Sequence, residues 1–157
     1  MKHTKYTLLI EKLVETKNIL KSLNRHPNFF VRTNLNEISR DELQKKLKAM
    51  GIESVASERT DTALKLFGKN LVANSLYERG FYSVQDESSQ ILIKEMEIEK
   101  NLCVVDVCAA PGGKTFAIAE RMKNTRMIYS RDIYIHKIKK IKNEAKRLRL
   151  SNVQASL

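Results

Sequence analysis

The sequence is poor in the residues from which metal sites are built. It contains two cysteines and three histidines, and the histidines are scattered along the chain. Four residues separate Cys103 from Cys108 and no second cysteine pair follows, so the spacing does not match a zinc site. No apolar run approaches the roughly 20 residues that cross a bilayer. We therefore expect no metal site, no membrane partner and a cytoplasmic protein.

Acidic residues are scarce relative to basic ones. The 157 residues include 29 Lys and Arg against 18 Asp and Glu, which gives a formal net charge of +11. This balance favours a polyanionic partner. The excess is concentrated between Arg121 and Arg149, where eleven residues are basic and two are acidic. A charge run is equally compatible with the solvated face of a helix, so charge alone does not decide for RNA.

Two glycine patterns that bind nucleotide phosphates are missing from the stretch DVCAAPGGKT at 106–115. A phosphate loop of the form G-x-x-x-x-G-K-[ST] needs a glycine at the position that Cys108 occupies. The dinucleotide pattern G-x-G-x-x-G is absent as well. These gaps argue against a nucleotide hydrolase and against a dinucleotide enzyme.

The same stretch does contain a glycine turn between an expected strand and an expected helix. Gly112 and Gly113 let the backbone bend tightly and approach a ligand. Asp106, just before the loop, is expected to orient it by accepting backbone N–H bonds. Asp132, 26 residues later, ends the next expected strand, where a carboxylate can accept hydrogen bonds from both ribose hydroxyls. The combination favours a ribose-bearing cofactor without a pyrophosphate, and a plain connecting turn is the alternative.

Periodicity and composition predict an α/β fold. The apolar stretch NLCVVDVCAA at 101–110 is typical of a strand buried on both faces of a parallel sheet, with Cys103 as a small buried side chain. Helices and strands alternate after it, as in the opening half of a doubly wound domain. Ser39 is a good N-cap for the helix that follows it, and 58–84 suggests short strands and turns. We expect helices at 5–24, 40–50, 85–100, 114–123 and 135–150, and strands at 29–33, 52–58, 101–110, 126–133 and 152–156.

A family resemblance extends this interpretation. VVDVCAAPGGKT closely resembles the cofactor-binding motif of the Sun/Fmu family of bacterial ribosomal RNA 5-methylcytosine methyltransferases. FFVRTN, GFYSVQDESSQ and RDIYIHKIKKIKNEAKRLRLSNV resemble further segments of that family, so the similarity spans residues 27–157. It implies a truncated, Rossmann-like methyltransferase sheet preceded by a small α+β domain. The expected parts are an N-terminal helix (1–26), an RNA-associated α+β domain (27–84) and the first half of an S-adenosylmethionine-binding domain (85–157).

The resemblance also implies the ligands and the residues that hold them. The cofactor is S-adenosylmethionine and the macromolecular partner is ribosomal RNA. Asp132 would hold the ribose, and Lys114 would line the site or face RNA, because the cofactor has no phosphate. The loop residues expected at the cofactor are Cys108, Ala109, Ala110, Pro111, Gly112, Gly113 and Lys114. Expected RNA contacts are Arg32 and Asn34 in the small domain and Lys137, Lys140 and Arg147 along the last helix.

The chain departs from the family in its cysteines. The family attacks cytosine C6 with a cysteine that follows threonine, and a second cysteine after proline assists product release. Here Leu102 precedes Cys103 and Val107 precedes Cys108. We therefore expect the nucleophile downstream of Leu157 and an inactive isolated chain, which is then either a fragment of a longer enzyme or a natural remnant. The alternative function is a non-catalytic RNA-binding or ribosome-assembly protein with a vestigial cofactor loop. With three of about seven strands present, an open sheet edge favours self-association.

Overall fold

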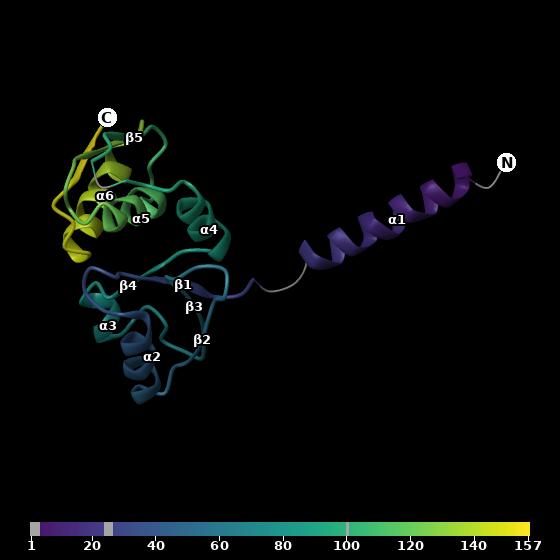
Figure 1. The fold of residues 1–157 in the computed structure, drawn as a ribbon, viewed down its shortest axis with the longest axis horizontal. Helices are drawn as coiled ribbons and strands as arrows, with labels where there is room; N and C mark the ends of the chain where they lie inside the picture. The colour runs from purple at the N-terminus through teal and green to yellow at the C-terminus, as the bar shows by residue number, and fades with distance from the viewer. Residues whose placement is uncertain (1–3, 24–26, 100) are drawn as a thin grey trace.

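The computed structural model describes residues 4–23, 27–99 and 101–157. It shows two lobes and a helix, α1 (Thr4–Leu23), which lies apart from both (Figure 1). We call residues 27–84 the antiparallel lobe and residues 85–157 the parallel lobe, after their sheets. The predicted N-terminal helix corresponds to α1, while residues 1–3 and 24–26 of the expected first segment lie outside the described residues. No helix among the described residues is both long and apolar enough to cross a membrane.

The antiparallel lobe has the β-α-β-β-α-β order of a ferredoxin-like unit. Its sheet order is β2-β3-β1-β4, and every pairing is antiparallel. The Ser39 side chain accepts a hydrogen bond of 3.2 Å from the Glu42 amide, so the predicted N-cap is confirmed. The segment 58–84, expected as strands and turns, also contains a short helix. The elements are β1 (Phe30–Thr33), α2 (Arg40–Ala49), β2 (Glu53–Ala56), β3 (Ala63–Phe67), α3 (Ser75–Glu78) and β4 (Tyr82–Val84).

The parallel lobe has the predicted alternation of strands and helices. Its three strands are parallel in the order β5-β6-β7, and Val105, Tyr129 and Gln154 lie side by side across them. The expected α/β fold, with a truncated doubly wound sheet behind a small α+β unit, is confirmed. The elements are α4 (Glu87–Glu95), β5 (Val104–Asp106), α5 (Gly113–Arg121), β6 (Ile128–Arg131), α6 (Ile135–Arg147) and β7 (Val153–Ser156).

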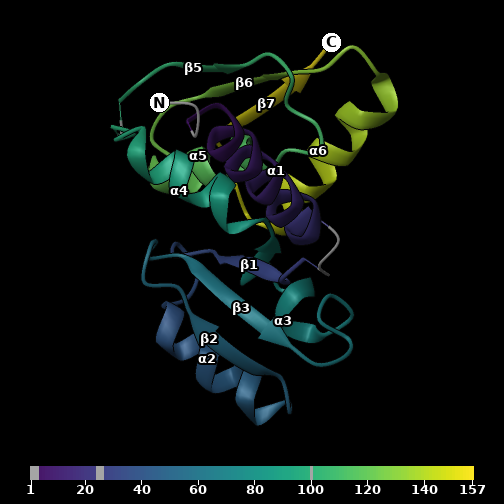
Figure 2. The same ribbon diagram turned by 90° about the vertical axis from the view of Figure 1, so that its right-hand side faces the viewer.

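Strand β5 corrects one prediction from the sequence. Helices α4, α5 and α6 all lie on one face of the parallel sheet (Figure 2). Ile128 of the neighbouring strand is fully buried on that face, but Val105 on the other face is 56% exposed and Cys103 is exposed too. The prediction of a strand buried on both faces at 101–110 is therefore wrong. The apolar composition of 101–110 is typical of a strand that has helices on both faces of its sheet. The described residues place helices on one face only.

The lobes have separate apolar cores. One core gathers around Phe116, Ile128 and Ile141 in the parallel lobe, and the other gathers around Val31 and Leu43 in the antiparallel lobe. Between them lie buried polar side chains, including Arg32, Gln90 and Glu120. Polar contacts are directional and need matched partners, so this boundary fixes how the lobes sit against each other.

Candidate cofactor site

The loop between β5 and α5 crosses the carboxyl end of the parallel sheet. Gly112 caps α5 with φ of 106°, in the left-handed region that favours glycine. A Cβ atom there would overlap the ring of Phe116, which is itself buried. The loop therefore lies tightly against the first turn of α5 and leaves backbone, rather than side chains, at the end of the strand.

Asp106 holds this loop from beneath. Its Oδ1 accepts a hydrogen bond from the Cys108 amide at 3.3 Å, and its Oδ2 accepts one from the Thr115 hydroxyl at 2.7 Å. The hydroxyl of Ser130, on the neighbouring strand, donates to Thr115 Oγ1 at 3.2 Å. The prediction that Asp106 orients the loop through a backbone N–H is confirmed. Its role is to position, because both carboxylate oxygens are already used inside the chain.

Asp132 lies against the same loop from the next strand. Its Oδ2 accepts from the Ala110 amide at 3.3 Å, its Oδ1 accepts from the Tyr134 amide at 3.2 Å, and Lys137 Nζ lies 3.7 Å from Oδ1. Burial, with 5% of the residue exposed, acts to raise the pKa of Asp132, but the two amides and Lys137 outweigh it and lower that pKa below its ordinary value. An ionised carboxylate has about four acceptor positions, so capacity remains for a ligand hydroxyl.

A hollow adjoins the loop. Asp106 and six of the seven predicted loop residues line it; Gly112 is buried beneath the turn, and Asp132 does not line it. Its other wall is the connection between the lobes, to which the sequence interpretation gave no role although GFYSVQDESSQ carried part of the resemblance. The wall residues are Val84, Gln85 and Ser89, and the loop residues are Cys108, Ala109, Ala110, Pro111, Gly113 and Lys114.

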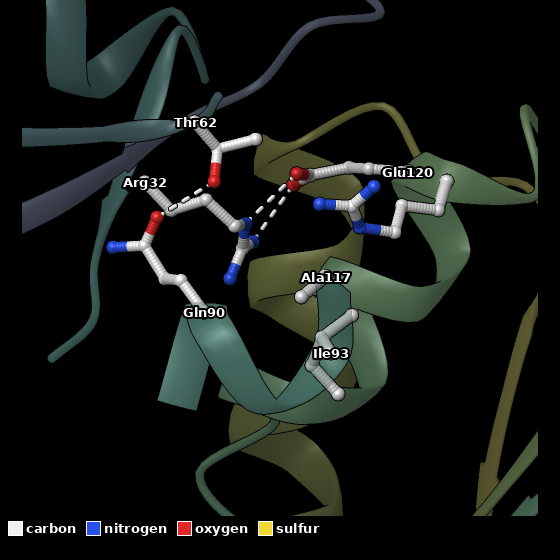
Figure 3. Close-up of a pocket in the computed structure, with 7 residues that line it drawn as sticks. Arg32, Thr62, Gln90, Ile93, Ala117 and Glu120 are labelled. Carbon is white, nitrogen blue, oxygen red and sulfur yellow. Dashed lines mark hydrogen bonds and ion pairs between the residues drawn. The ribbon is translucent and has the colours of Figure 1, made fainter. Parts of the chain in front are cut away.

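An arginine from the antiparallel lobe, Arg32, pairs with Glu120 of α5 (Figure 3). Arg32 forms two bonds of 2.8 Å to the Glu120 carboxylate, through Nε and Nη2. Its Nη1 donates to Gln85 Oε1 at 2.5 Å and to the Gly113 carbonyl at 3.0 Å. Burial raises the pKa of Glu120, and the guanidinium opposes that rise. This Arg32 cluster (Arg32, Gln85, Gly113 and Glu120) ties β1 to the loop and to α5.

Two residues predicted to contact RNA are buried between the lobes. Arg32 is 2% exposed and Asn34 is fully buried. The Asn34 amide donates to the carbonyls of Gly80 and Leu148, at 3.1 Å each, and so bridges the two lobes. Because the donors of both side chains are engaged inside the chain, we assign Arg32 and Asn34 a structural role in place of RNA contact.

The three predicted contacts on α6 differ from one another. Lys137 pairs with Asp132 and lies 4.7 Å from the Tyr134 ring centre, so it belongs to the candidate site. Arg147 is half-buried, donates to the Tyr82 carbonyl at 3.2 Å and stacks 3.9 Å from the centre of the Tyr77 ring. Lys140 is exposed. Of the three, Lys140 has the exposure that a phosphate contact requires.

Comparison with known proteins places these features in a family. Residues 93–157 match the family model of the 16S rRNA methyltransferase RsmB/F, and residues 13–73 match that of the ferredoxin-like domain of RsmF/B-like methyltransferases. These ranges cover the strands and loop of the candidate site and most of the antiparallel lobe.

Individual relatives agree with the family models. The chain is 36% identical over 129 residues to a probable ribosomal RNA small subunit methyltransferase B of Bacillus subtilis, and the match covers 82% of this chain and 29% of that protein. A Synechocystis protein of the same description is 30% identical, with 89% and 32% covered. The crystal structure of PH0851 superposes with a TM-score of 0.84 at 33% identity, covering 94% of this chain and 35% of the other. The chain thus spans about a third of the length of these relatives.

Proposed function

Because the chain belongs to the RsmB/F family of 16S rRNA methyltransferases, we propose that it binds S-adenosylmethionine and takes part in methylating carbon 5 of a cytosine in ribosomal RNA. One observation carries the proposal: the ionised Asp132 carboxylate lies 3.3 Å from the Ala110 amide of the glycine loop, at adjacent strand ends. Cofactors bind at the carboxyl ends of parallel strands. The proposed substrate places this activity in the cytoplasm.

In this proposal each part of the loop has a defined task. Asp132 accepts hydrogen bonds from the ribose, using the acceptor capacity that its two amide partners leave free. The loop from Cys108 to Lys114 surrounds the methionine and ribose parts, and Gly112 keeps that backbone bare. When bound, the cofactor supplies an activated methyl group. Lys114 is exposed and has no phosphate to bind there, which leaves it available to RNA.

The chain's own cysteines do not provide the nucleophile in this proposal. Cys108 belongs to the cofactor loop, and neither it nor Cys103 follows threonine or proline. We therefore propose that residues 27–84 form an RNA-associated domain and residues 85–157 a cofactor domain, while the attack on cytosine needs a cysteine from outside these 157 residues. Among the described residues, one edge of β5 has no partner strand and Val105 is exposed on the uncovered face of the sheet; both features support self-association of the chain.

Titration with S-adenosylhomocysteine tests the cofactor site. We expect the wild-type chain to bind it and Asp132→Ala to bind at least about tenfold more weakly, since a hydrogen bond to a charged group contributes about 1.5–3 kcal/mol. Asp41→Ala, an exposed carboxylate on α2, is the matched control and should keep wild-type affinity. Isothermal calorimetry measures all three. Unchanged affinity in Asp132→Ala, or no binding by the wild type, contradicts the proposed site.

A methyl-transfer assay tests the assignment of the nucleophile. Incubation of the 157-residue chain with tritiated S-adenosylmethionine and ribosomal RNA should leave no label in the RNA above a protein-free blank. The reason is that cytosine C5 is a poor nucleophile until a thiolate adds to C6. Label incorporation that survives Cys103→Ala but disappears in Cys108→Ala, while Cys108→Ala still binds S-adenosylhomocysteine as the wild type does, would identify Cys108 as the nucleophile and contradict the assignment.

A further inference from the structure

Two adjoining hollows lie beside the candidate cofactor site. The first lies between α6 and the antiparallel lobe and begins at the loop backbone of Pro111 and Gly113. A second hollow shares Asn143 and Arg147 with the first, so the two hollows adjoin each other. It extends past Arg79, Lys146 and Arg149 near the end of α6. We call these two hollows together the α6 groove.

One side of α6 lines this groove. Lys140, Asn143 and Arg147 are spaced i, i+3 and i+7, which places them on a single helix face. Ile138, Ile141 and Ala145 occupy the opposite side and are buried in the core of the parallel lobe. The helix is therefore held by its apolar face and presents its cationic face to the groove.

The groove is electropositive. It has five basic lining residues, Arg79, Lys140, Lys146, Arg147 and Arg149, against two acidic ones, Glu78 and Glu144. Arg147 Nε donates to Glu144 Oε2 at 2.9 Å, so the charge of Glu144 is largely matched inside the groove wall. Arg149 is paired with Glu37 of the antiparallel lobe. Lys140, Lys146 and Arg79 are exposed, and a row of phosphates fits their charge.

The end near the cofactor loop has a different character. Val84 and Pro111 are exposed there, Tyr77 is half-buried, and Phe116 also contributes to the lining. Apolar and aromatic surface between cationic side chains is typical of proteins that bind single-stranded nucleic acid, because unpaired bases expose flat faces. In a duplex those faces are stacked and hidden. The groove therefore suits a single strand better than a double helix.

From these features we propose that the α6 groove binds single-stranded RNA, with phosphates along Lys140, Lys146 and Arg79 and unpaired bases over the apolar end beside Pro111. The orientation of the RNA in the groove rests on the proposed function. The apolar end of the groove adjoins the loop assigned to the methyl donor, so the unpaired bases are placed at that end. The α6 groove would then be the path along which RNA reaches that site.

Binding of a fluorescein-labelled oligocytidylate of about 12 nucleotides, a length within the usual range of such sites, tests this path by fluorescence anisotropy. Lys140→Met/Lys146→Met removes two phosphate contacts with little change in side-chain length. We expect its affinity at low salt to fall about tenfold and the slope of log K against log salt to become shallower by about 1.4, since a single strand contributes roughly 0.7 per phosphate contact.

Lys45→Met/Lys48→Met is the matched control. It removes the same charge from exposed positions on α2, in the other lobe and away from α6 (Figure 1). The control should keep the wild-type salt slope, and an RNA duplex of equal length should bind the wild type at least about tenfold more weakly than the single strand. Equal loss of slope in both double variants, or preference for the duplex, would overturn the groove proposal.

The cofactor titration separates the two proposals. The groove variant should bind S-adenosylhomocysteine as the wild type does, because Lys140 and Lys146 do not line the hollow beside the loop. If the wild type binds oligocytidylate in the groove but binds no S-adenosylhomocysteine, the proposed function fails while the groove stands. If it binds S-adenosylhomocysteine and the groove variant keeps its RNA slope, only the groove proposal fails.

Discussion

Glu120→Ala is expected to lower the free energy of unfolding by about 3–5 kcal/mol, because it leaves the buried guanidinium of Arg32 without its counter-charge. Both charged groups are almost wholly removed from water, at 2% exposure for Arg32 and 7% for Glu120. Gln85 and the Gly113 carbonyl would still accept from Arg32, but neither carries a negative charge. Urea denaturation followed by circular dichroism measures the change.

Two further variants isolate the cause. Arg32→Met/Glu120→Leu removes both charges and should recover most of the loss, since apolar replacement of a buried pair is often neutral. Asp61→Ala breaks a different contact between the lobes, the 3.1 Å ion pair with Arg121, in which Asp61 is 55% exposed. Exposed pairs contribute about 0–1 kcal/mol. A loss in Glu120→Ala no larger than that in Asp61→Ala would show that the pair does not hold the lobes together.

Much of the fold follows from local signals. Ser39 caps α2 because its side chain accepts a hydrogen bond from the backbone amide of Glu42, three residues later. A contact over so short a separation can be predicted from the sequence. The alternation of apolar strands with helices after residue 100 likewise predicts the parallel sheet. The exposure of the sheet face beside Val105 could not be predicted from local signals. Burial of a strand on both faces depends on whether helices distant in sequence pack against each face.

Some contacts of the candidate site could be predicted from sequence spacing, and others could not. Asp106, the glycine turn and Asp132 share a short β-α-β unit, whose topology brings strand ends together, so sequence spacing predicts their meeting. Arg32 on β1 and Glu120 on α5 are 88 residues apart in the sequence and lie in different lobes, and no spacing rule connects them. The family resemblance implied RNA contacts for Arg32 and Asn34, whereas in the fold both side chains join the two lobes.

Gly80→Ala is expected to lower the free energy of unfolding nearly as much as Glu120→Ala does. The cause is a steric clash rather than an unpaired charge. Gly80 lies between α3 and β4 with φ of 77°, and its carbonyl accepts from the Asn34 amide that bridges to Leu148. A Cβ atom on residue 80 would overlap the carbonyl oxygen of Arg147 and lie 3.1 Å from its carbonyl carbon. Both partners are backbone at the end of α6, so no side chain can rotate away and the lobes must separate.

The chain provides a closely matched control for that clash. Gly51 has φ of 76°, and nothing lies within 4 Å of its hypothetical Cβ. Gly51→Ala should therefore cost only the left-handed backbone strain of about 1–2 kcal/mol, whereas Gly80→Ala adds an overpacking cost of about 1–3 kcal/mol. Urea denaturation gives both values, and small-angle X-ray scattering should show a larger radius of gyration for Gly80→Ala alone. Equal decreases in the free energy of unfolding in the two variants would mean that the lobes can move apart without an energetic penalty. The α6 groove would then lack the fixed wall that a defined RNA path requires.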